Sequence, residues 1–542
     1  MVTISEALAI ALEHHQLGRF QAADRIYRQI LQVEPDHAET LHLRGLVAHQ
    51  NGENAAAVEY LGRAVTLCPQ AAAYRNNLGT ACRALGRLEQ AVACYRDAIR
   101  IAPDFVEAHY NLGNTVAVQG KLDEAIACYR QAIQLRPDYA DAHNNLAIAL
   151  QTQGKLVEAA ACYRRALRLM PGRADILYNL GNVLADQGGL DEARQCYRRA
   201  IELRPDYAEA WNCLGTAIQA QGKLEEGIAC YREALRHRPG FAAALNNLGN
   251  TLRQQEKLDE AAACLGRALQ LQPDSAEIHA NLAAVLQAQG KLDRAVACYR
   301  RALELKPDYG PVYENLGFVL QQQGQLDEAV DCYRRAVQLR PEHADSHYYL
   351  AVALQSQRNH REAAVGFQRV LALRPDYPQA HFRLANAYRE QGDFDDAAAC
   401  YRRAVEVRPD DAEAHHGLAS LLHLQGKLRE AGECYRQVLR LDPQHAEAHF
   451  NLAIALVDTG KPDEAVALYR RAVEINPGYF QAWNNLGLTL QTLGRLDEAL
   501  ECYGRVLQIR PDVATSHSNL LIALHYRAGV IPAEIVAAYA EF

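Results

Sequence analysis

Residues 137–171 read PDYADAHNNLAIALQTQGKLVEAAACYRRALRLMP, and copies of this unit make up nearly all of the 542-residue chain. Prolines stand at positions 35, 69, 103, 137, 171, 205, 239, 273, 307, 341, 375, 409, 443, 477 and 511, so 15 of the 19 prolines are spaced 34 residues apart. A fixed period of this length is typical of a stacked repeat array. The chain is therefore expected to form one quasi-linear array whose core runs continuously between neighbouring repeats.

Each unit predicts two helices. Between residues 139 and 153 the apolar positions recur at three- and four-residue spacing, which places them on one face of a first helix. Gly154 stands where a left-handed residue would end that helix, and a second periodic run begins at Leu156. Pro171 cannot continue a helix, so it closes the unit. Asp138 follows the preceding proline and is predicted to accept hydrogen bonds from the free amides of the first helix.

Small residues predict how the two helices meet. Ala159 and nearly all of its 34-residue equivalents are alanine, and the position of Ala147 alternates with glycine, as at Gly113. Small side chains on facing helices permit a close antiparallel approach, and Tyr163 would fill the remaining gap. This pattern resembles the tetratricopeptide repeat. The resemblance implies an all-α fold, a solenoid of antiparallel helix pairs wound into a right-handed superhelix, with about 15 repeats over residues 1–513. Residues 514–542 would then hold the last first helix and the start of a helical linker toward a further domain.

Charge gives little reason to expect a nucleic-acid partner. The net charge is −8 and the isoelectric point is about 6.2, whereas a nucleic-acid-binding surface normally needs a basic face. Arginine pairs such as Arg164-Arg165 recur on the second helices, where a solvated outer face is favoured over a binding stripe.

Cysteine and histidine usage favours neither disulfides nor metal. Eleven of the 14 cysteines occupy one repeat position, and equivalent atoms in stacked helices lie at least ~8 Å apart, which is too far for a disulfide. Free thiols are consistent with a reducing cytoplasm. Histidines share one register without the pair spacing of a metal site. We therefore expect no metal, no cofactor and no catalytic residue in this chain, and neither a signal peptide nor a membrane span.

The most informative polar position lies eight residues after each proline, on the first helix. Ten asparagines occupy it, although asparagine is a mediocre helix former: Asn77, Asn111, Asn145, Asn179, Asn247, Asn281, Asn315, Asn451, Asn485 and Asn519. A carboxamide both donates and accepts, so a row of them on the inner surface of a superhelix could bind the backbone of an extended peptide. The alternative is that each asparagine bonds a neighbouring helix and sets the repeat spacing. The row is interrupted at Leu43, Cys213, Tyr349, Arg383 and Gly417, and different binding is expected at the last three.

Acidic residues one turn before the row, such as Glu107, Asp141 and Asp175, would make this surface favour neutral or basic polar segments. Their alternative role is to complement the helix dipole near helix starts.

Two features narrow the family further. They are the asparagine row, in repeats of the form HNNLA…GKLxEAxxCYRRALxLxP, and the ending SHSNLLIALHYRAGVIPAEIVAAYAEF at residues 516–542. Together they resemble the arm of the O-linked N-acetylglucosamine transferase and SPINDLY-type family, in which such an ending precedes the catalytic lobes. The resemblance implies that the ten asparagines contact the backbone of a substrate peptide. It also implies that the nucleotide-sugar pocket lies outside residues 1–542.

The sequence thus predicts a protein- or peptide-binding scaffold, with the substrate-recruiting arm of a protein O-GlcNAc transferase-like enzyme as its leading form. Proteins or extended, Ser/Thr-rich segments would be its partners, and homo-oligomerisation is compatible with the pattern. Richness in Ala and Arg with only two Met favours a bacterial source. The alternative is a free-standing assembly scaffold without any link to glycosylation, and an enzyme complete within this chain is disfavoured.

Overall fold

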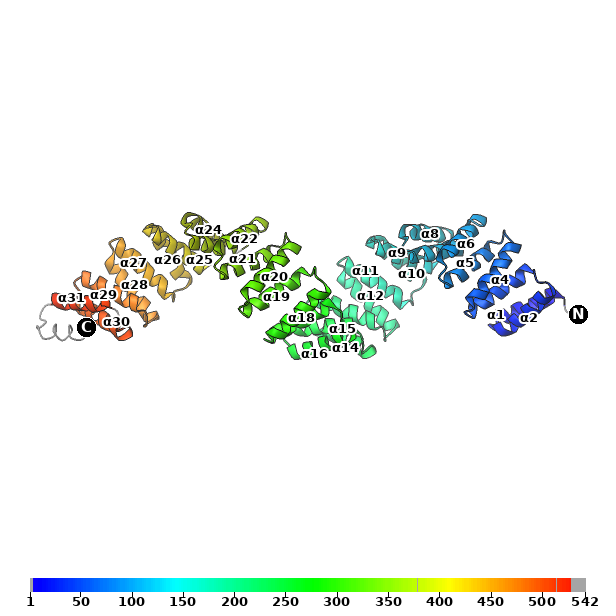
Figure 1. Ribbon diagram of the computed structural model, residues 1–542, viewed down its shortest axis with the longest axis horizontal. Coiled ribbons are helices and arrows are strands. Elements are labelled where there is room, and N and C mark those ends of the chain that lie inside the picture. The colour runs from blue at the N-terminus through cyan, green and yellow to red at the C-terminus, as the bar shows by residue number, and fades with distance from the viewer. Residues whose placement is uncertain (1–2, 378, 513, 528–542) are drawn as a thin grey trace. The chain divides into compact units, whose positions relative to one another are not determined.

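A computed structural model describes residues 3–377, 379–512 and 514–527. Within these residues the chain forms 31 α-helices and no strand, which confirms the all-α prediction. The helices group into two compact units, residues 1–273 and 274–542. In both units consecutive helices pack as antiparallel pairs, one pair for each 34-residue repeat (Figure 1).

The first unit holds eight helix pairs, in which the odd-numbered helix is the first of each repeat. They are α1 (Ile4–Gln16), α2 (Phe20–Val33), α3 (Ala38–Gln50), α4 (Asn54–Leu67), α5 (Ala72–Ala84), α6 (Leu88–Ile101), α7 (Val106–Val118), α8 (Leu122–Leu135), α9 (Ala140–Thr152), α10 (Leu156–Leu169), α11 (Ala174–Asp186), α12 (Leu190–Leu203), α13 (Ala208–Gln219), α14 (Leu224–His237), α15 (Ala242–Gln254) and α16 (Leu258–Leu271).

The second unit continues the same alternation through seven further pairs and ends, within the described residues, on a first helix. They are α17 (Ala276–Ala288), α18 (Leu292–Leu305), α19 (Gly310–Gln322), α20 (Leu326–Leu339), α21 (Ala344–Ser356), α22 (His360–Leu373), α23 (Ala380–Gln391), α24 (Phe394–Val407), α25 (Ala412–Leu424), α26 (Leu428–Leu441), α27 (Ala446–Asp458), α28 (Pro462–Ile475), α29 (Phe480–Thr492), α30 (Leu496–Ile509) and α31 (Ala514–Tyr526). The helical extension predicted after α31 lies outside the described residues.

The turn inside each repeat requires a left-handed backbone. Gly154, between α9 and α10, has a φ of +75°, as predicted for a residue that ends the first helix. Glu256 and Arg358 replace the glycine in two repeats and keep the same conformation, with φ of 60° and 61°. A side chain in this region costs ~1–2 kcal/mol, so the packing of the flanking helices holds the turn in place.

The prediction for Asp138 is wrong in one respect. The residue that precedes α9 directly is Tyr139, and its side chain makes no capping hydrogen bond. Where a side chain does cap a first helix, it comes from this later position: Ser275 accepts from the Ile278 amide, and Asp411 accepts from the Ala414 amide. The aspartate after the proline lies one residue too early.

Contact between the two helices of a repeat depends on the predicted small residues. Ala159 and Tyr163 are completely buried. A Cβ at position 113 would lie only 2.7 Å from Cε1 of Tyr129, so the tyrosine ring occupies the space that the missing side chain leaves. The repeated tyrosine is therefore the main filler between first and second helices, as predicted.

The buried tyrosine hydroxyls have alternative partners on the first helix of their own repeat. Where the residue twelve positions earlier is glutamine, its Oε1 accepts from the tyrosine, in the pairs Tyr163–Gln151, Tyr231–Gln219, Tyr299–Gln287, Tyr333–Gln321 and Tyr503–Gln491. In other repeats the partner is a polar residue fifteen positions earlier, in the pairs Tyr95–Thr80, Tyr129–Asn114, Tyr197–Asn182, Tyr401–Asn386 and Tyr435–Ser420. Both arrangements satisfy a buried hydroxyl that would otherwise be costly.

One repeat keeps the glutamine but has lost the tyrosine. Phe367 stands in the tyrosine position, and Oε1 of Gln355, twelve residues earlier, is buried without a hydrogen-bond partner among the described residues. We expect Phe367→Tyr to stabilise the chain by about 0.5–1.5 kcal/mol, because the new hydroxyl can donate to this oxygen. Urea denaturation followed by circular dichroism measures the gain. The gain should vanish in a Gln355→Met background, and an unchanged or lower midpoint for the single variant would contradict the assignment.

Candidate peptide-binding face

The ten asparagines lie on first helices, from α5 to α31, at equivalent positions. Asn315 is exposed and the other nine are half-buried, so none of these side chains belongs to the closed core. We call the side of the first helices that carries them the asparagine face.

In the first unit, four of these side chains bridge to the preceding first helix. Each donates its Nδ2 to the residue 35 positions earlier: Asn77 to His42 at 2.8 Å, Asn111 to Asn76 at 3.0 Å, Asn145 to Tyr110 at 3.0 Å, and Asn247 to Asn212 at 3.0 Å. The alternative interpretation of the row, that it sets the spacing between repeats, is therefore supported at these four positions.

Bridging does not exhaust the hydrogen-bonding capacity of the carboxamides. Asn111 and Asn247 each use one N–H, and their Oδ1 atoms accept no hydrogen bond within the described residues. The side chains of Asn179, Asn315 and Asn451 make no hydrogen bond with any other described residue. At Asn111 and Asn247 the bridge fixes the direction of the carboxamide while its oxygen stays open to an N–H donor. Oδ1 of Asn77 and of Asn145 already accepts from the preceding asparagine.

Apolar side chains lie three residues after some of the asparagines, nearly one helical turn further along the same face, whereas Asn114 and Asn250 occupy this position after Asn111 and Asn247. Ile148 is 43% exposed, Phe318 45% and Leu488 48%. This position is apolar in four of the five repeats where a glutamine accepts from the buried tyrosine, as Gln151 does from Tyr163, and the exception is Thr216. The asparagine face is thus amphipathic, a feature that we did not derive from the sequence, although the residue three positions after each asparagine could have indicated it.

The carboxylates near the row are largely neutralised. Arg136 Nη2 lies 2.6 Å from Glu107 Oε1, and Arg173 contacts both Asp141 at 3.2 Å and Asp175 at 2.7 Å. The hydrogen bond from Arg173 lowers the pKa of Asp175 below its ordinary value. These ion pairs weaken the expectation that the face selects basic segments, because the charge is already balanced by arginines of the chain.

The register histidines have a structural role. Nε2 of His109 lies 2.9 Å from the carbonyl oxygen of Pro103, and His143 and His347 make the same contact with their own prolines. Trp211 occupies this register too, and its indole N–H donates to the Pro205 carbonyl at 3.0 Å. Side chains at this histidine register therefore tie many of the first helices, though not those with Leu177 or Leu245 there, to the proline that precedes them. No group of three potential metal ligands occurs in the described residues.

The arginine pairs form an ion-pair ladder along the second helices. The arginine that follows the repeated tyrosine, which is the first of a pair in five of these repeats, reaches the glutamate 28 residues later on the next second helix: Arg96–Glu124, Arg130–Glu158, Arg164–Glu192, Arg232–Glu260, Arg300–Glu328, Arg334–Glu362, Arg402–Glu430 and Arg470–Glu498. Half-exposed pairs of this kind contribute ~0–1 kcal/mol each. They support the interpretation of a solvated outer face.

All 14 cysteines lie within the described residues and are unpaired. Burial raises the pKa of Cys128 to about 11 and that of Cys502 to about 12, so these thiols are protonated at neutral pH and are poor nucleophiles.

Among the described helices, none combines the length and the apolar composition of a membrane span.

The asparagine row is interrupted at Tyr349 on α21, Arg383 on α23 and Gly417 on α25. A hollow of about 300 Å³ opens at the first of these positions, lined by Phe318, Tyr348, Tyr349 and Val352 among others. The Tyr349 ring stacks on the buried Tyr333, with centroids 6.0 Å apart. Amides are thus replaced here by an exposed aromatic surface.

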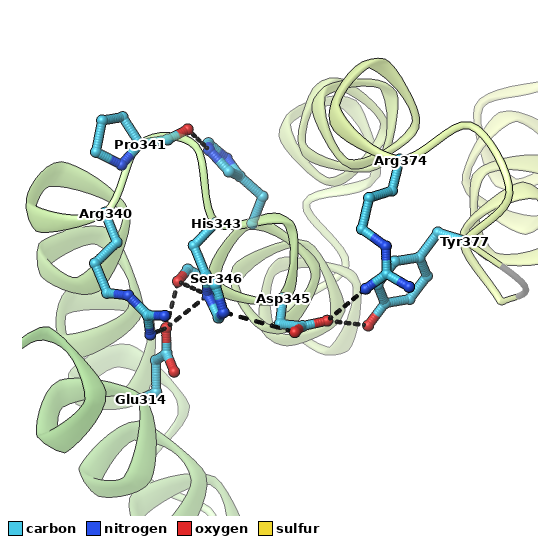
Figure 2. Close-up of polar contacts among 9 residues, drawn as sticks. Glu314, Arg340, Pro341, His343, Asp345, Ser346, Arg374 and Tyr377 are labelled. Atoms are coloured by element: carbon cyan, nitrogen blue, oxygen red, sulfur yellow. Dashed lines mark hydrogen bonds and ion pairs between the residues drawn. The ribbon is translucent and has the colours of Figure 1, made fainter. Parts of the chain in front are cut away.

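A polar network fixes α21 against α19 near this hollow (Figure 2). Glu314 on α19 is only 12% exposed; its Oε1 accepts from Arg340 at 3.0 Å and lies 3.3 Å from His343 Nδ1. Ser346 Oγ also donates to this oxygen. The Glu314 carboxylate on α19 therefore contacts three side chains, one in α21 and two in the segment just before α21.

The network extends toward the segment before α23. Asp345 Oδ1 accepts from the Tyr377 hydroxyl at 2.8 Å and lies 4.0 Å from Arg374, while Asp345 Oδ2 lies 3.7 Å from His343 Nε2. Figure 2 shows these residues following one another from Glu314 to Tyr377. Three successive repeats are thereby linked around the interruption of the row.

Comparisons with known proteins agree with this architecture. Tetratricopeptide repeat profiles match residues 8–72, 298–331, 382–446, 425–480 and 450–514, a TPR repeat profile matches residues 79–120 and 319–357, and a profile for the cilia and flagella-associated protein 70 C-terminal domain matches residues 105–312. No curated protein sequence matches the chain.

Solved structures resemble the chain in part. YrrB, described as a TPR protein with an unusual peptide-binding site, is 26% identical over 34% of this chain and 95% of its own, with a TM-score of 0.31. A chain of the APC/C hetero-tetramer Cut9–Hcn1 is 15% identical over 84% of this chain and 97% of its own, with a TM-score of 0.38. MamA is 26% identical over 30% of this chain and 95% of its own, with a TM-score of 0.30.

Repeat profiles that match residues 8–72, 79–120, 298–357 and 382–514, together with the paired helices, define the class: a solenoid of tetratricopeptide repeats. The chain is a tetratricopeptide repeat protein, and thus a protein-interaction scaffold.

Proposed function

We propose that the chain binds extended polypeptide segments along the asparagine face. The observation that carries this proposal is the orientation of the bridged carboxamides. Asn111 and Asn247 are held by one N–H each and leave Oδ1 unoccupied. An extended peptide has free N–H and C=O groups, and the oxygens along the face match the N–H donors.

The apolar positions beside the row support the same proposal. Ile148, Phe318 and Leu488 are each between 43% and 48% exposed on the asparagine face. Carboxamides bind any backbone alike, whereas apolar side chains add contact area for the side chains of the peptide. Ser/Thr-rich segments fit, because polar segments of this kind stay disordered in solution and expose their backbone.

A matched pair of variants separates peptide binding from repeat spacing. Asn247→Ala and Asn212→Ala both break the 3.0 Å bridge between α13 and α15. Only the first removes the open oxygen, since Asn212 is 9% exposed. We expect Asn247→Ala to weaken binding of a fluorescein-labelled Ser/Thr-rich peptide about five-fold in anisotropy titrations, as one net hydrogen bond is worth ~1 kcal/mol. Asn212→Ala should bind like the wild type. Equal losses in both variants would show that the row acts only as a spacer.

The finer form of this proposal is that the scaffold recruits substrates for a protein O-GlcNAc transferase-like glycosyltransferase. It rests on the resemblance of the asparagine row and of the ending that follows Ser518-Asn519 on α31. Reading the coding sequence downstream of residue 542 tests it. Several hundred residues of α/β pattern would support the transferase arm, and a stop codon would favour a free-standing scaffold.

A further inference from the structure

The interruption of the asparagine row coincides with the aromatic hollow on α19 and α21. Tyr349 occupies the register of the asparagines, and its side chain is 39% exposed. Phe318, three residues after Asn315, is 45% exposed on the same face. These two rings and that of Tyr348 line a hollow of about 300 Å³. This volume is at the small end of the range for ligand pockets. Its size is suited to one side chain.

The hollow is held in shape by its surroundings. The Tyr348 ring packs on Phe367 at 5.8 Å and on Tyr377 at 5.0 Å, and its hydroxyl donates to Gln379 at 2.6 Å. The network from Glu314 to Asp345 fixes α21 against α19 at the same place (Figure 2). A preformed aromatic hollow favours another aromatic ring, because edge-to-face and offset contacts add to the burial of apolar area.

The next interruption adds a positive charge. Arg383 on α23 is half-buried, and its guanidinium makes no ion pair or hydrogen bond within the described residues. Its neighbour in register on the preceding first helix is Tyr349. Packed helices lie ~8–10 Å apart, and an extended peptide rises ~3.3 Å per residue, so about three peptide residues span one repeat.

We propose that α19, α21 and α23 read the sequence of the bound peptide, by holding an aromatic side chain in the hollow and an acidic side chain, about three residues away, at Arg383. This inference rests on the proposed peptide binding and deepens it. The asparagines bind any backbone, whereas α21 and α23, which lack them, select the segment together with Phe318 of α19. An Arg–carboxylate pair at the second position supplies the charge complementarity.

The test uses Ser/Thr-rich fluorescein-labelled peptides that differ at two positions only. One peptide carries a phenylalanine followed three residues later by a glutamate. A second peptide carries the two residues in the opposite order, with the glutamate three residues before the phenylalanine. The control peptides replace phenylalanine, glutamate or both by alanine. We expect the full chain to bind the better-matched Phe/Glu peptide at least about tenfold more tightly than the double-alanine peptide.

Three variants assign the preference to its residues. Tyr349→Asn restores the residue that is common in the asparagine row. Tyr349→Asn and Phe318→Ala should each abolish the preference for phenylalanine, while binding of the double-alanine peptide persists. Arg383→Asn should abolish only the preference for glutamate. The first two residues are exposed and the third is half-buried with an unpaired guanidinium, so the variants should keep wild-type helicity by circular dichroism.

The outcomes distinguish this inference from the broader proposal. Equal affinity for all peptides, unchanged by the three variants, overturns the selection site and leaves backbone binding by the asparagines in place. Absence of binding to every peptide overturns both. A preference that survives Tyr349→Asn and Phe318→Ala also overturns the assignment, because the ring would then be held elsewhere.

Discussion

Tyr163→Ala should destabilise its repeat by about 3–5 kcal/mol, as typical for removing a large aromatic side chain from a closed core. The side chain is completely buried between α9 and α10, where it packs among small residues such as Ala147 and Ala159. These alanine side chains are too short to fill the space that the tyrosine ring would leave. The variant also leaves Gln151 Oε1, which accepts from the tyrosine hydroxyl at 3.0 Å, without its partner.

A repeat array responds to such damage locally. Its stability is approximately a sum of repeat and neighbour terms, so a weak repeat in the middle separates two folded segments. Hydrogen exchange of the Tyr163→Ala variant should accelerate in α9, α10 and their neighbours well before distant helices. Tyr163→Phe serves as the matched variant: it keeps the ring and should lose only about 1–3 kcal/mol for the unpaired glutamine. Uniform acceleration over the whole chain would contradict the local description.

The strongest sequence signals were geometric. The helix pairs were predicted from the prolines spaced 34 residues apart, the glycine of the turn, and the tyrosine with its small neighbours. Each of these residues acts within one repeat, through steric effects that are the same in any chain. Leu156, where the second periodic run was expected, is the residue at which α10 begins. Glu256 and Arg358 show the strength of this context, since both adopt the left-handed turn without being glycine.

Contacts between repeats were harder to derive from the sequence. The bridge from Asn111 to Asn76, the arginine ladder and the network around Glu314 join residues 26 to 35 positions apart, and only the stacking of repeats brings them together. The aromatic hollow depends on the same stacking. The sequence revealed that the row stops at Tyr349, but the combination of Phe318 and Tyr349 in one hollow required the packing of α19 against α21.

Replacing Asn111, Asn145, Asn179, Asn247 and Asn281 together by alanine should have the largest effect on binding. At ~1 kcal/mol for each net hydrogen bond, the five substitutions should weaken a bound Ser/Thr-rich segment by up to about 3 × 10³-fold. The loss should be spread over the sites, because the oxygens of a repeated face act on successive backbone amides. Anisotropy titrations with the labelled peptide measure it.

The five asparagines also contribute to the stack, so the control must break bridges without removing the open oxygens. Asn76→Ala and Asn212→Ala remove the partners of Asn111 and Asn247, and Tyr110→Phe removes one of the two partners of Asn145, which keeps its hydrogen bond to Asn114 Oδ1 at 2.8 Å. Both sets should keep wild-type helicity, because the tyrosine and alanine core between the paired helices is untouched. The control set should bind the peptide within a few-fold of the wild type. If the fivefold alanine variant binds as tightly as the wild type, the asparagine face is not the binding surface; if the two sets lose affinity equally, its role is to space the repeats.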